Sequence, residues 1–253
     1  YKIKISKIPH TFNEIYSRAI KDSPDLQPWK GHYLVRRIET EILADRFNFE
    51  KSYIGLEIGC GNAFQSALLA SASKRMFATD LFKENGSTHS LGIIKAQNMI
   101  NKLGTGNVTL ISCSADSLPF TDNYFDFVFS SSALEHMEDR GSVLNEIKRV
   151  LKTNGYLILI LPTHMPSIYA FPHVLLYALV RTWKLLSQKN SQASSDISLV
   201  NRFKKGHRSF PLPEPHGNYP NIFKELSQQF PQKWINLIGK SGFKVIECFP
   251  TCL

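Results

Sequence analysis

The sequence has few cysteines, and none of them is spaced like a metal ligand. Its four cysteines, Cys60, Cys113, Cys248 and Cys252, form no Cys-x-x-Cys motif and have no histidine-rich segment beside them. Cys60 also lies between two glycines, where a disulfide would be awkward. We therefore expect a protein of a reducing, cytoplasmic compartment that carries no structural metal.

The sequence also lacks an apolar run long enough to cross a bilayer. The uncharged run from Val174 to Val180 has seven residues, whereas a membrane-spanning helix needs about 20. Residues 1–5 show no apolar stretch followed by a cleavage site, so no signal peptide is predicted. Between residues 181 and 208, seven Lys and Arg residues stand against one acid, Asp196. This balance favours an anionic membrane surface as a partner, and a lid helix with a solvated basic loop is the alternative interpretation.

The remaining composition predicts a globular protein with an anionic partner. The 253 residues are 43% hydrophobic and 20% charged, which suffices to bury the core of one α/β domain. Lys and Arg exceed Asp and Glu by 30 to 21, so the net charge is +9. This charge favours nucleic acid, a phosphorylated substrate or an acidic membrane surface, without choosing among them.

Hydrophobic periodicity divides the chain into four parts. Residues 1–50 carry amphipathic helical runs and predict an N-terminal helical cap. Residues 51–163 alternate short apolar runs with helical ones, which is typical of a doubly wound, mostly parallel, Rossmann-like α/β sheet. Residues 164–231 differ in composition and are interpreted as an insertion or lid that contacts substrate or membrane. Residues 232–253 are predicted to supply the last helix and strand of the core.

The same patterns place the individual elements. We expect strands at 53–58, 75–79, 108–112, 125–130, 156–161 and 243–249. We expect helices at 12–20, 32–47, 63–70, 141–152 and 232–240. Between the helix at 141–152 and the strand that follows it, Asn154-Gly155 is expected to form a turn.

Two glycines follow the first predicted strand of the sheet directly. Gly59 and Gly61 stand between this strand and a helical run, where they let the backbone turn tightly and bring its N–H groups close to a ligand. Asp80 ends the next predicted strand, 19 residues beyond Gly61. A carboxylate at this place can accept hydrogen bonds from both hydroxyls of a ribose. The combination predicts a nucleotide-type cofactor.

The neighbours of the glycines argue against a dinucleotide cofactor. The dinucleotide fingerprint has a third glycine at the position of Phe64. Glu57 would place negative charge near a pyrophosphate, whereas it suits the cationic amino and sulfonium groups of S-adenosylmethionine. We therefore expect S-adenosylmethionine, with a tight βα turn of no further role as the alternative.

The motifs between residues 53 and 162 resemble the cofactor-binding core of class I methyltransferases, in the ubiquinone/menaquinone-biosynthesis-like subgroup. The segments that carry this resemblance are Leu56-Glu57-Ile58-Gly59-Cys60-Gly61, Asp80, Ser117-Leu118-Pro119-Phe120, Asn123-Tyr124-Phe125-Asp126, Ala133-Leu134-Glu135-His136, Arg149-Val150-Leu151-Lys152 and Gly155. The resemblance implies methyl transfer from S-adenosylmethionine. It also implies cofactor-binding roles for Glu57, Gly59, Cys60, Gly61, Asp80, Leu81, Ser114, Ala115, Asp116 and Ser131.

One departure from the family concerns the adenine contact. Where the family often has Gly-Asp-Ala, this chain has Cys113-Ser114-Ala115, so Ser114 replaces the usual acceptor of the adenine amino group. Asp116 is the alternative acceptor.

Two histidines are candidate general bases. Methyl transfer is an in-line displacement at an activated carbon, so a base helps only when the acceptor must lose a proton. His136 follows the predicted strand at 125–130, at the edge of the sheet where such sites open, and His164 follows the strand at 156–161. A surface or helix-capping histidine is the alternative for His136. His207 and His216, in the insertion, could contact substrate or lie in a plain loop.

The N-terminal cap and the acceptor leave further alternatives open. Trp29, His32, Tyr33 and Arg36 could close over the cofactor or hold an anionic acceptor, or they could simply pack the cap onto the sheet. The leading hypothesis is methylation of a small-molecule, lipid or lipid-linked acceptor. The alternatives are an RNA methyltransferase, for which no RNA-binding appendage or base-methylation motif is found, and a non-catalytic scaffold that binds S-adenosylmethionine. The oligomeric state is not predicted.

Overall fold

The computed structural model describes residues 10–21, 30–81, 92–161, 176 and 222–250. The chain divides into two compact units, the first formed by residues 1–161 with 238–253 and the second by residues 162–237. The first unit contains the sheet. The predicted insertion at 164–231 falls within the second unit, most of which lies outside the described residues.

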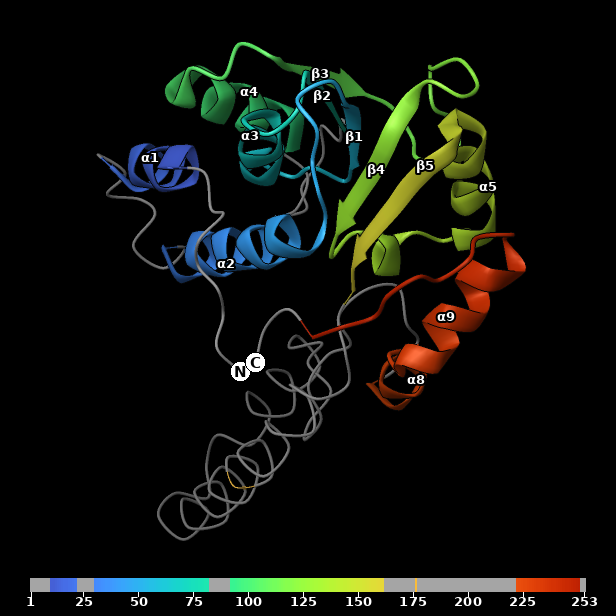
Figure 1. Ribbon diagram of the computed structural model, residues 1–253. Helices are drawn as coiled ribbons and strands as arrows, with labels where there is room; N and C mark the ends of the chain where they lie inside the picture. Colours follow the sequence, from blue (N-terminus) through green and yellow to red (C-terminus); the bar gives the residue numbers. More distant parts are fainter. Residues whose placement is uncertain (1–9, 22–29, 82–91, 162–175, 177–221, 251–253) are drawn as a thin grey trace, which may run out of the picture. The chain divides into compact units, whose positions relative to one another are not determined.

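The centre of the first unit is a parallel sheet of five strands (Figure 1). The strands are β1 Ile54–Ile58, β2 Arg75–Asp80, β3 Val108–Ser112, β4 Phe125–Ser131 and β5 Leu151–Ile160. Their spatial order is β3-β2-β1-β4-β5, so the chain runs outward from β1 to one edge and then returns to the other side of β1. Open α/β sheets bind ligands at the carboxyl ends of the strands where the strand order reverses in this way, which here are β1 and β4.

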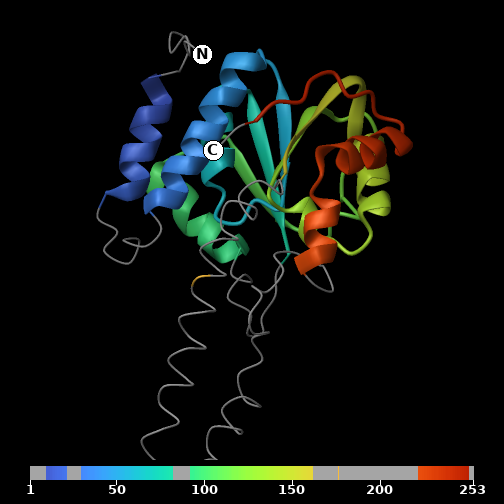
Figure 2. The same ribbon diagram turned by 90° about the horizontal axis from the view of Figure 1, so that it is seen from below.

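Helices cover both faces of the sheet, as the alternating pattern predicted. The helices of this unit are α1 His10–Ile20, α2 Lys30–Arg46, α3 Phe64–Ala70, α4 Gly92–Leu103 and α5 Arg140–Val150. The first four pack against one another on one face and α5 lies on the other, as Figure 2 shows. The Rossmann-like α/β fold and the N-terminal helices are therefore confirmed. Helix α4, which was not predicted, supplies the crossover that parallel neighbours β2 and β3 require.

The approach to β5 differs from the prediction. Helix α5 ends at Val150, and β5 begins at Leu151 without an intervening turn. The pairing with β4 then jumps, since Leu151 lies opposite Phe125 and Tyr156 lies opposite Phe127. The residues predicted to form a turn, Asn154-Gly155, lie in this irregular stretch of the strand, so the turn signal marks a break in register inside β5.

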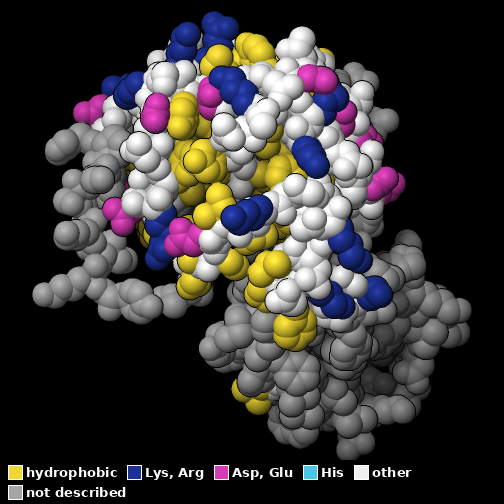
Figure 3. Space-filling model, turned by 45° about the vertical axis from the view of Figure 1, so that its right-hand side comes forward, with side chains coloured by type: hydrophobic (Ala, Val, Ile, Leu, Met, Phe, Trp, Pro, Cys, Tyr) yellow, Lys and Arg dark blue, Asp and Glu magenta, His cyan; other side chains and the backbone are white. Residues whose placement is uncertain are grey.

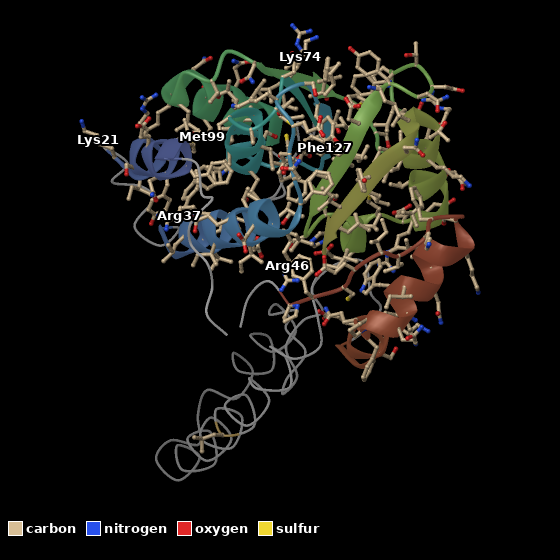
Figure 4. All side chains as sticks on the ribbon, viewed as in Figure 1. Lys21, Arg37, Arg46, Lys74, Met99 and Phe127 are labelled. Atoms are coloured by element: carbon tan, nitrogen blue, oxygen red, sulfur yellow. The ribbon has the colours of Figure 1, made fainter. Side chains whose placement is uncertain are left out.

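The strand predicted at 243–249 does not form. Residues 243–250 join no ladder and include the exposed side chains Val245 and Ile246. Arg46, at the end of α2 and labelled in Figure 4, forms an ion pair with Glu247 and lies 4.3 Å above the ring centroid of Phe249. Side-chain contacts therefore hold this segment where β-branched and aromatic residues indicated backbone pairing.

The second unit is described only in part. Helices α8 Ile222–Gln228 and α9 Pro231–Lys240 are assigned, and α9 confirms the helix predicted at 232–240 although its last residues belong to the first unit. Gln229 Nε2 donates a 2.6 Å hydrogen bond to Glu225 Oε1, and both residues are buried.

The described residues include no membrane-spanning helix, and the face drawn in Figure 3 shows no single basic patch. In the part of the chain that the structure describes, no helix has both the length and the apolar character to cross a bilayer. On the face drawn in Figure 3, Lys and Arg side chains are scattered among acidic and hydrophobic ones. The basic segment 181–208 and the run Val174–Val180, apart from Leu176, lie outside the described residues, so membrane contact stays a prediction.

Phe127 lies at the centre of the core, on the middle of β4 (Figure 4). It is fully buried, and its ring meets the ring of Phe49 edge to face at a centroid distance of 5.1 Å. The facing position on β1 is Gly55, where a Cβ atom would overlap the Phe127 ring and the sulfur of Met76. The glycine thus leaves the space that the aromatic ring fills.

We expect Phe127→Ala to lower the free energy of unfolding by about 3–5 kcal/mol, because it leaves a cavity that this close-packed region cannot refill. Urea denaturation followed by circular dichroism measures the change. Ile246→Ala is the matched control, since this side chain is 77% exposed and its removal should cost little. Equal losses in both variants would contradict the placement of Phe127 at the centre of the core.

Candidate functional site

The glycine turn after β1 is held by the end of β2. Gly59 and Gly61 both have positive φ values, of 71° and 55°, which glycine adopts without strain. The carbonyl of Thr79 accepts hydrogen bonds from the N–H groups of Gly59 and Cys60, at 2.9 and 3.0 Å. The spacing of this motif therefore gives the sharp turn that the sequence predicted.

The two glycines face different surroundings. A Cβ atom on Gly59 would overlap the side chain of Ala133, which lies in the turn after β4. A Cβ atom on Gly61 would have no atom within 4 Å. Gly59 is thus needed for close packing between two turns, whereas Gly61 borders open space that a ligand can enter.

Asp80 lies directly against the glycine turn. Its Oδ2 accepts a 2.7 Å hydrogen bond from Gly61 N–H, and its Oδ1 accepts one of 2.7 Å from Leu81 N–H. Burial raises the pKa of the Asp80 carboxyl, and these two hydrogen bonds oppose the rise. Each carboxylate oxygen retains further acceptor capacity, so the group can still bind hydroxyls of a ligand.

Glu57 is a buried carboxylate at the end of β1. Its side chain is 2% exposed and accepts a hydrogen bond from the hydroxyl of Ser66 on α3. Burial raises the pKa of Glu57 to about 8, although the Ser66 hydroxyl and the positive charge of Arg36 act in the opposite direction. An incoming cation would therefore meet a group that can become its counter-ion by losing a proton.

Arg36, on helix α2 of the N-terminal cap, contacts the carboxyl end of β4. Arg36 Nη1 donates hydrogen bonds to Ser131 Oγ at 2.6 Å and to Glu39 Oε2 at 2.9 Å. Ser131 is the last residue of β4 and is buried. The cap is thus tied to the carboxyl ends of the strands, and the contact from Arg36 to Ser131 was not predicted.

Tyr33 joins the cap to the glycine turn itself. Its hydroxyl accepts a 2.8 Å hydrogen bond from Asn62 Nδ2, and its ring meets that of Phe64 edge to face at 5.0 Å. Asn62 Oδ1 in turn accepts from the N–H of Phe64 at the start of α3. Tyr33 is buried, which supports the packing interpretation of this residue.

The segment after β3 flanks Asp80 on the other side. The N–H of Cys113 donates to the backbone carbonyl of Asp80 at 3.2 Å, so residues 114–116 follow directly after a residue that contacts the backbone of Asp80. Ser114 and Asp116 are exposed and Ala115 is half-buried. The predicted adenine-side residues thus leave the sheet from the strand that pairs with the end of β2, where Asp80 lies opposite Ser112.

Arg149 fixes the loop that follows this segment. Its guanidinium donates to the carbonyls of Leu118 and Phe120 at 3.0 and 2.8 Å, and it pairs with Asp122 and Glu146. These acidic partners raise the pKa of Arg149, so it stays charged. The sequence identified Arg149 only as a member of a family motif. The structure shows that its guanidinium holds the loop Leu118-Pro119-Phe120 in place.

The turn after β4 carries Glu135 and His136. It is a short 3-10 helix, Leu134–His136, whose carbonyls at Leu134 and Glu135 accept hydrogen bonds from Arg140 at 3.2 and 2.8 Å. His136 is 45% exposed, and its Nε2 lies 3.9 Å from Oε1 of the fully buried Glu135. His164, His207, His216 and Trp29 lie outside the described residues, so nothing tests their predicted roles.

Comparison with known proteins assigns the family of this site. Residues 56–159, which include the glycine turn, Asp80 and the turn after β4, match the family model described as a methyltransferase domain. The demethylmenaquinone methyltransferase of Geobacillus kaustophilus (strain HTA426) is 34% identical over 129 residues. Residues 56–159 form a class I methyltransferase domain.

The resemblance seen in the motifs is thereby confirmed, including the ubiquinone/menaquinone-biosynthesis-like subgroup and S-adenosylmethionine as the cofactor of the domain. The match to the Geobacillus kaustophilus protein covers 50% of this chain and 52% of that relative. The demethylmenaquinone methyltransferase of Geobacillus sp. (strain WCH70) is 27% identical over 174 residues, which cover 68% of this chain and 69% of the relative. The chain therefore spans between about half and two thirds of the length of these relatives.

A solved structure agrees on the fold of the methyltransferase domain. A protein from Bacillus halodurans C-125, described as a candidate methyltransferase, superposes with a TM-score of 0.53 at 18% identity. The superposition covers 82% of this chain and 70% of that chain. At this identity the likeness supports the Rossmann-like fold alone.

We expect Glu57 to make the stability of the domain depend on pH. The folded protein holds the Glu57 proton up to about pH 8, whereas the unfolded chain releases it near the ordinary value of 4.5. The free energy of unfolding should therefore fall as pH rises from 4.5 to 8, by on the order of a few kcal/mol from this group. Urea denaturation of the wild type and of Glu57→Gln at pH 5 and pH 8 measures the difference.

Glu57→Gln keeps a partner for the Ser66 hydroxyl but cannot ionise, so its stability should fall less over this range. Titrating groups that do not interact with Glu57 are common to both proteins and cancel in the comparison. The same pH dependence in both proteins would contradict a buried, protonated Glu57.

Proposed function

We propose that this chain transfers a methyl group from S-adenosylmethionine to a hydroxyl-bearing, quinone-like acceptor of small-molecule or lipid type. The observation that carries the proposal is the Asp80 carboxylate hydrogen-bonded to Gly61 N–H, beside the open face of the glycine turn. This arrangement supports the proposal, because a carboxylate that can accept from ribose hydroxyls lies beside free space for a ligand. S-adenosylmethionine supplies a methyl carbon that its positively charged sulfur activates.

The residues around the turn fit the two ends of this cofactor. Asp80 accepts hydrogen bonds from the two ribose hydroxyls, and the glycine turn from Gly59 through Cys60 to Gly61 lets the backbone approach the methionine end. Glu57 lies buried at the end of β1, where its carboxylate balances the positive charge of the amino and sulfonium groups. Ser131 borders the same end of the site through its hydrogen bond to Arg36.

The adenine end is assigned to the segment after β3. Leu81, which follows Asp80 directly, is 45% exposed and offers an apolar surface beside the ribose acid. Ala115 offers a second apolar contact, and Ser114 or Asp116 accepts the adenine amino group. Both polar side chains are exposed, so either can turn toward a bound base.

The acceptor class rests on the named relatives and on the candidate base. Both Geobacillus relatives are named as enzymes that act on demethylmenaquinone. Methylating a quinol at carbon or oxygen requires the loss of a proton, which a base can accelerate. The partly exposed His136, after β4, stands at the carboxyl edge of the sheet where that proton would be removed. A cytoplasmic location with contact to an anionic membrane would bring the protein to such a lipid.

We expect Asp80→Asn to weaken S-adenosylmethionine binding by about 10- to 100-fold, because a charged hydrogen-bond acceptor is replaced by a neutral amide. Titration calorimetry measures the dissociation constant. Asp45→Asn is the control, because Asp45 is exposed on α2, and its affinity should match the wild type. Undiminished affinity in Asp80→Asn would remove Asp80 from the ribose site, and tighter binding of NAD than of S-adenosylmethionine would refute the cofactor.

The acceptor is tested with a radiolabelled methyl donor. We expect label to pass to a quinol-containing lipid extract and not to total RNA from the same cells. Transfer to RNA alone would replace the proposed acceptor by the RNA alternative. Bound cofactor without transfer to either extract would favour the non-catalytic scaffold.

A further inference from the structure

Glu135 is a buried carboxylate that the roles assigned above do not use. Its side chain is completely inaccessible to solvent, although it lies only one residue from the partly exposed His136. Neither of its carboxylate oxygens has a hydrogen-bond partner on another described residue. An ionised carboxylate without partners is costly to bury, so its retention at the mouth of a ligand site calls for a functional reason.

The surroundings of Glu135 favour partial ionisation. Burial raises the pKa of Glu135 to about 6, while a hydrogen bond from its own backbone N–H and the positive charges of Arg36 on α2 and Arg140 on α5 act to lower it. His136, on the same turn, places its Nε2 at 3.9 Å from Glu135 Oε1. At neutral pH the carboxylate is therefore available as a counter-ion for a group that becomes positively charged.

The turn that carries both side chains is fixed on two sides. Arg140 binds the carbonyls of Leu134 and Glu135, and Ala133 packs against Gly59 of the glycine turn. Ser132, just before it, has a positive φ of 49°, which is uncommon for a residue other than glycine. The pair is thus held at a set position relative to the cofactor turn, although 3.9 Å exceeds a hydrogen-bond distance. Such contacts are often long without substrate and shorten when the complex forms.

We propose that Glu135 is a positioning residue that orients the His136 imidazole and stabilises its protonated form while His136 takes a proton from the methyl acceptor. This inference rests on the proposed function. The acceptor hydroxyl gives its proton to the unprotonated imidazole nitrogen that faces it, while Glu135 pairs with the opposite N–H. The acceptor forms its bond to the methyl carbon as the sulfur–methyl bond breaks and leaves its electron pair on sulfur. The exposed imidazolium then releases the proton to water.

The decisive variant is Glu135→Gln, which keeps the size of the side chain and removes its charge. A carboxylate beside an imidazole stabilises the imidazolium, so the His136 imidazole should titrate at a pH about one unit lower in the variant. Nuclear magnetic resonance of histidine-labelled protein measures this directly and needs no turnover. The acid limb of the kcat profile should move to lower pH by the same amount, and kcat at the optimum should fall about 10-fold.

Glu138→Gln is the matched control, because Glu138 is an exposed carboxylate three residues further along the same segment. It should leave both the titration and the profile unchanged. S-adenosylmethionine binding, measured by calorimetry, should be retained in Glu135→Gln. A purely structural Glu135 would change stability without moving the His136 titration, and that result would overturn the inference.

Failure of the proposed function and failure of the Glu135–His136 pairing give different experimental results. If the wild type does not bind S-adenosylmethionine, the proposed function fails, whereas the titration of His136 still reports whether Glu135 pairs with it. If Glu135→Gln does not fold, Glu135→Asp provides the second test. Its shorter carboxylate lies further from the imidazole, so the titration should shift in the same direction by a smaller amount. An unmoved titration in the folded variant would again refute the pairing.

Discussion

The hydrogen bond from Gly61 N–H to the Asp80 carboxylate joins the two turns that frame the site. It can form because β1 and β2 are parallel neighbours in register, with Ile58 beside Thr79, so both turns leave the sheet at the same edge. Thr79 adds a second tie through its carbonyl, which accepts from Gly59 and Cys60. The glycine turn therefore has its shape before any ligand binds. Because the turn is preformed, little of the binding free energy is lost in ordering it.

Charge is concentrated in the interior around this frame. Glu57, Glu39 and Glu135 are all buried, and the guanidinium of Arg36 is paired with Glu39 and acts on the other two. Two of these acids have raised pKa values, so the region can hold or release protons without unfolding. The cap helix α2 supplies the cation, which makes the cap part of the electrostatics of the site as well as part of its packing.

The sequence predicted the structure correctly where a local pattern of residue types by itself determines the conformation. Alternating apolar runs predicted all five strands, and Gly61 with Asp80 predicted two groups that the structure brings into contact. Sequence reasoning failed where the outcome depended on distant partners. The segment 243–249 has strand-forming residues, yet Arg46 holds it by side-chain contacts instead of backbone pairing. The burial of Glu135 likewise depends on what packs over it, and no local pattern reports that.

The close approach of Gly59 and Ala133 limits how the site can be altered. These two residues belong to turns that follow β1 and β4, and there is no room for an additional methyl group between them. A larger side chain at either position would have to push the cofactor turn away from the turn that carries His136. Changes that enlarge the site for bulkier methyl-donor analogues must therefore be made on the side of Gly61, where the backbone borders open space.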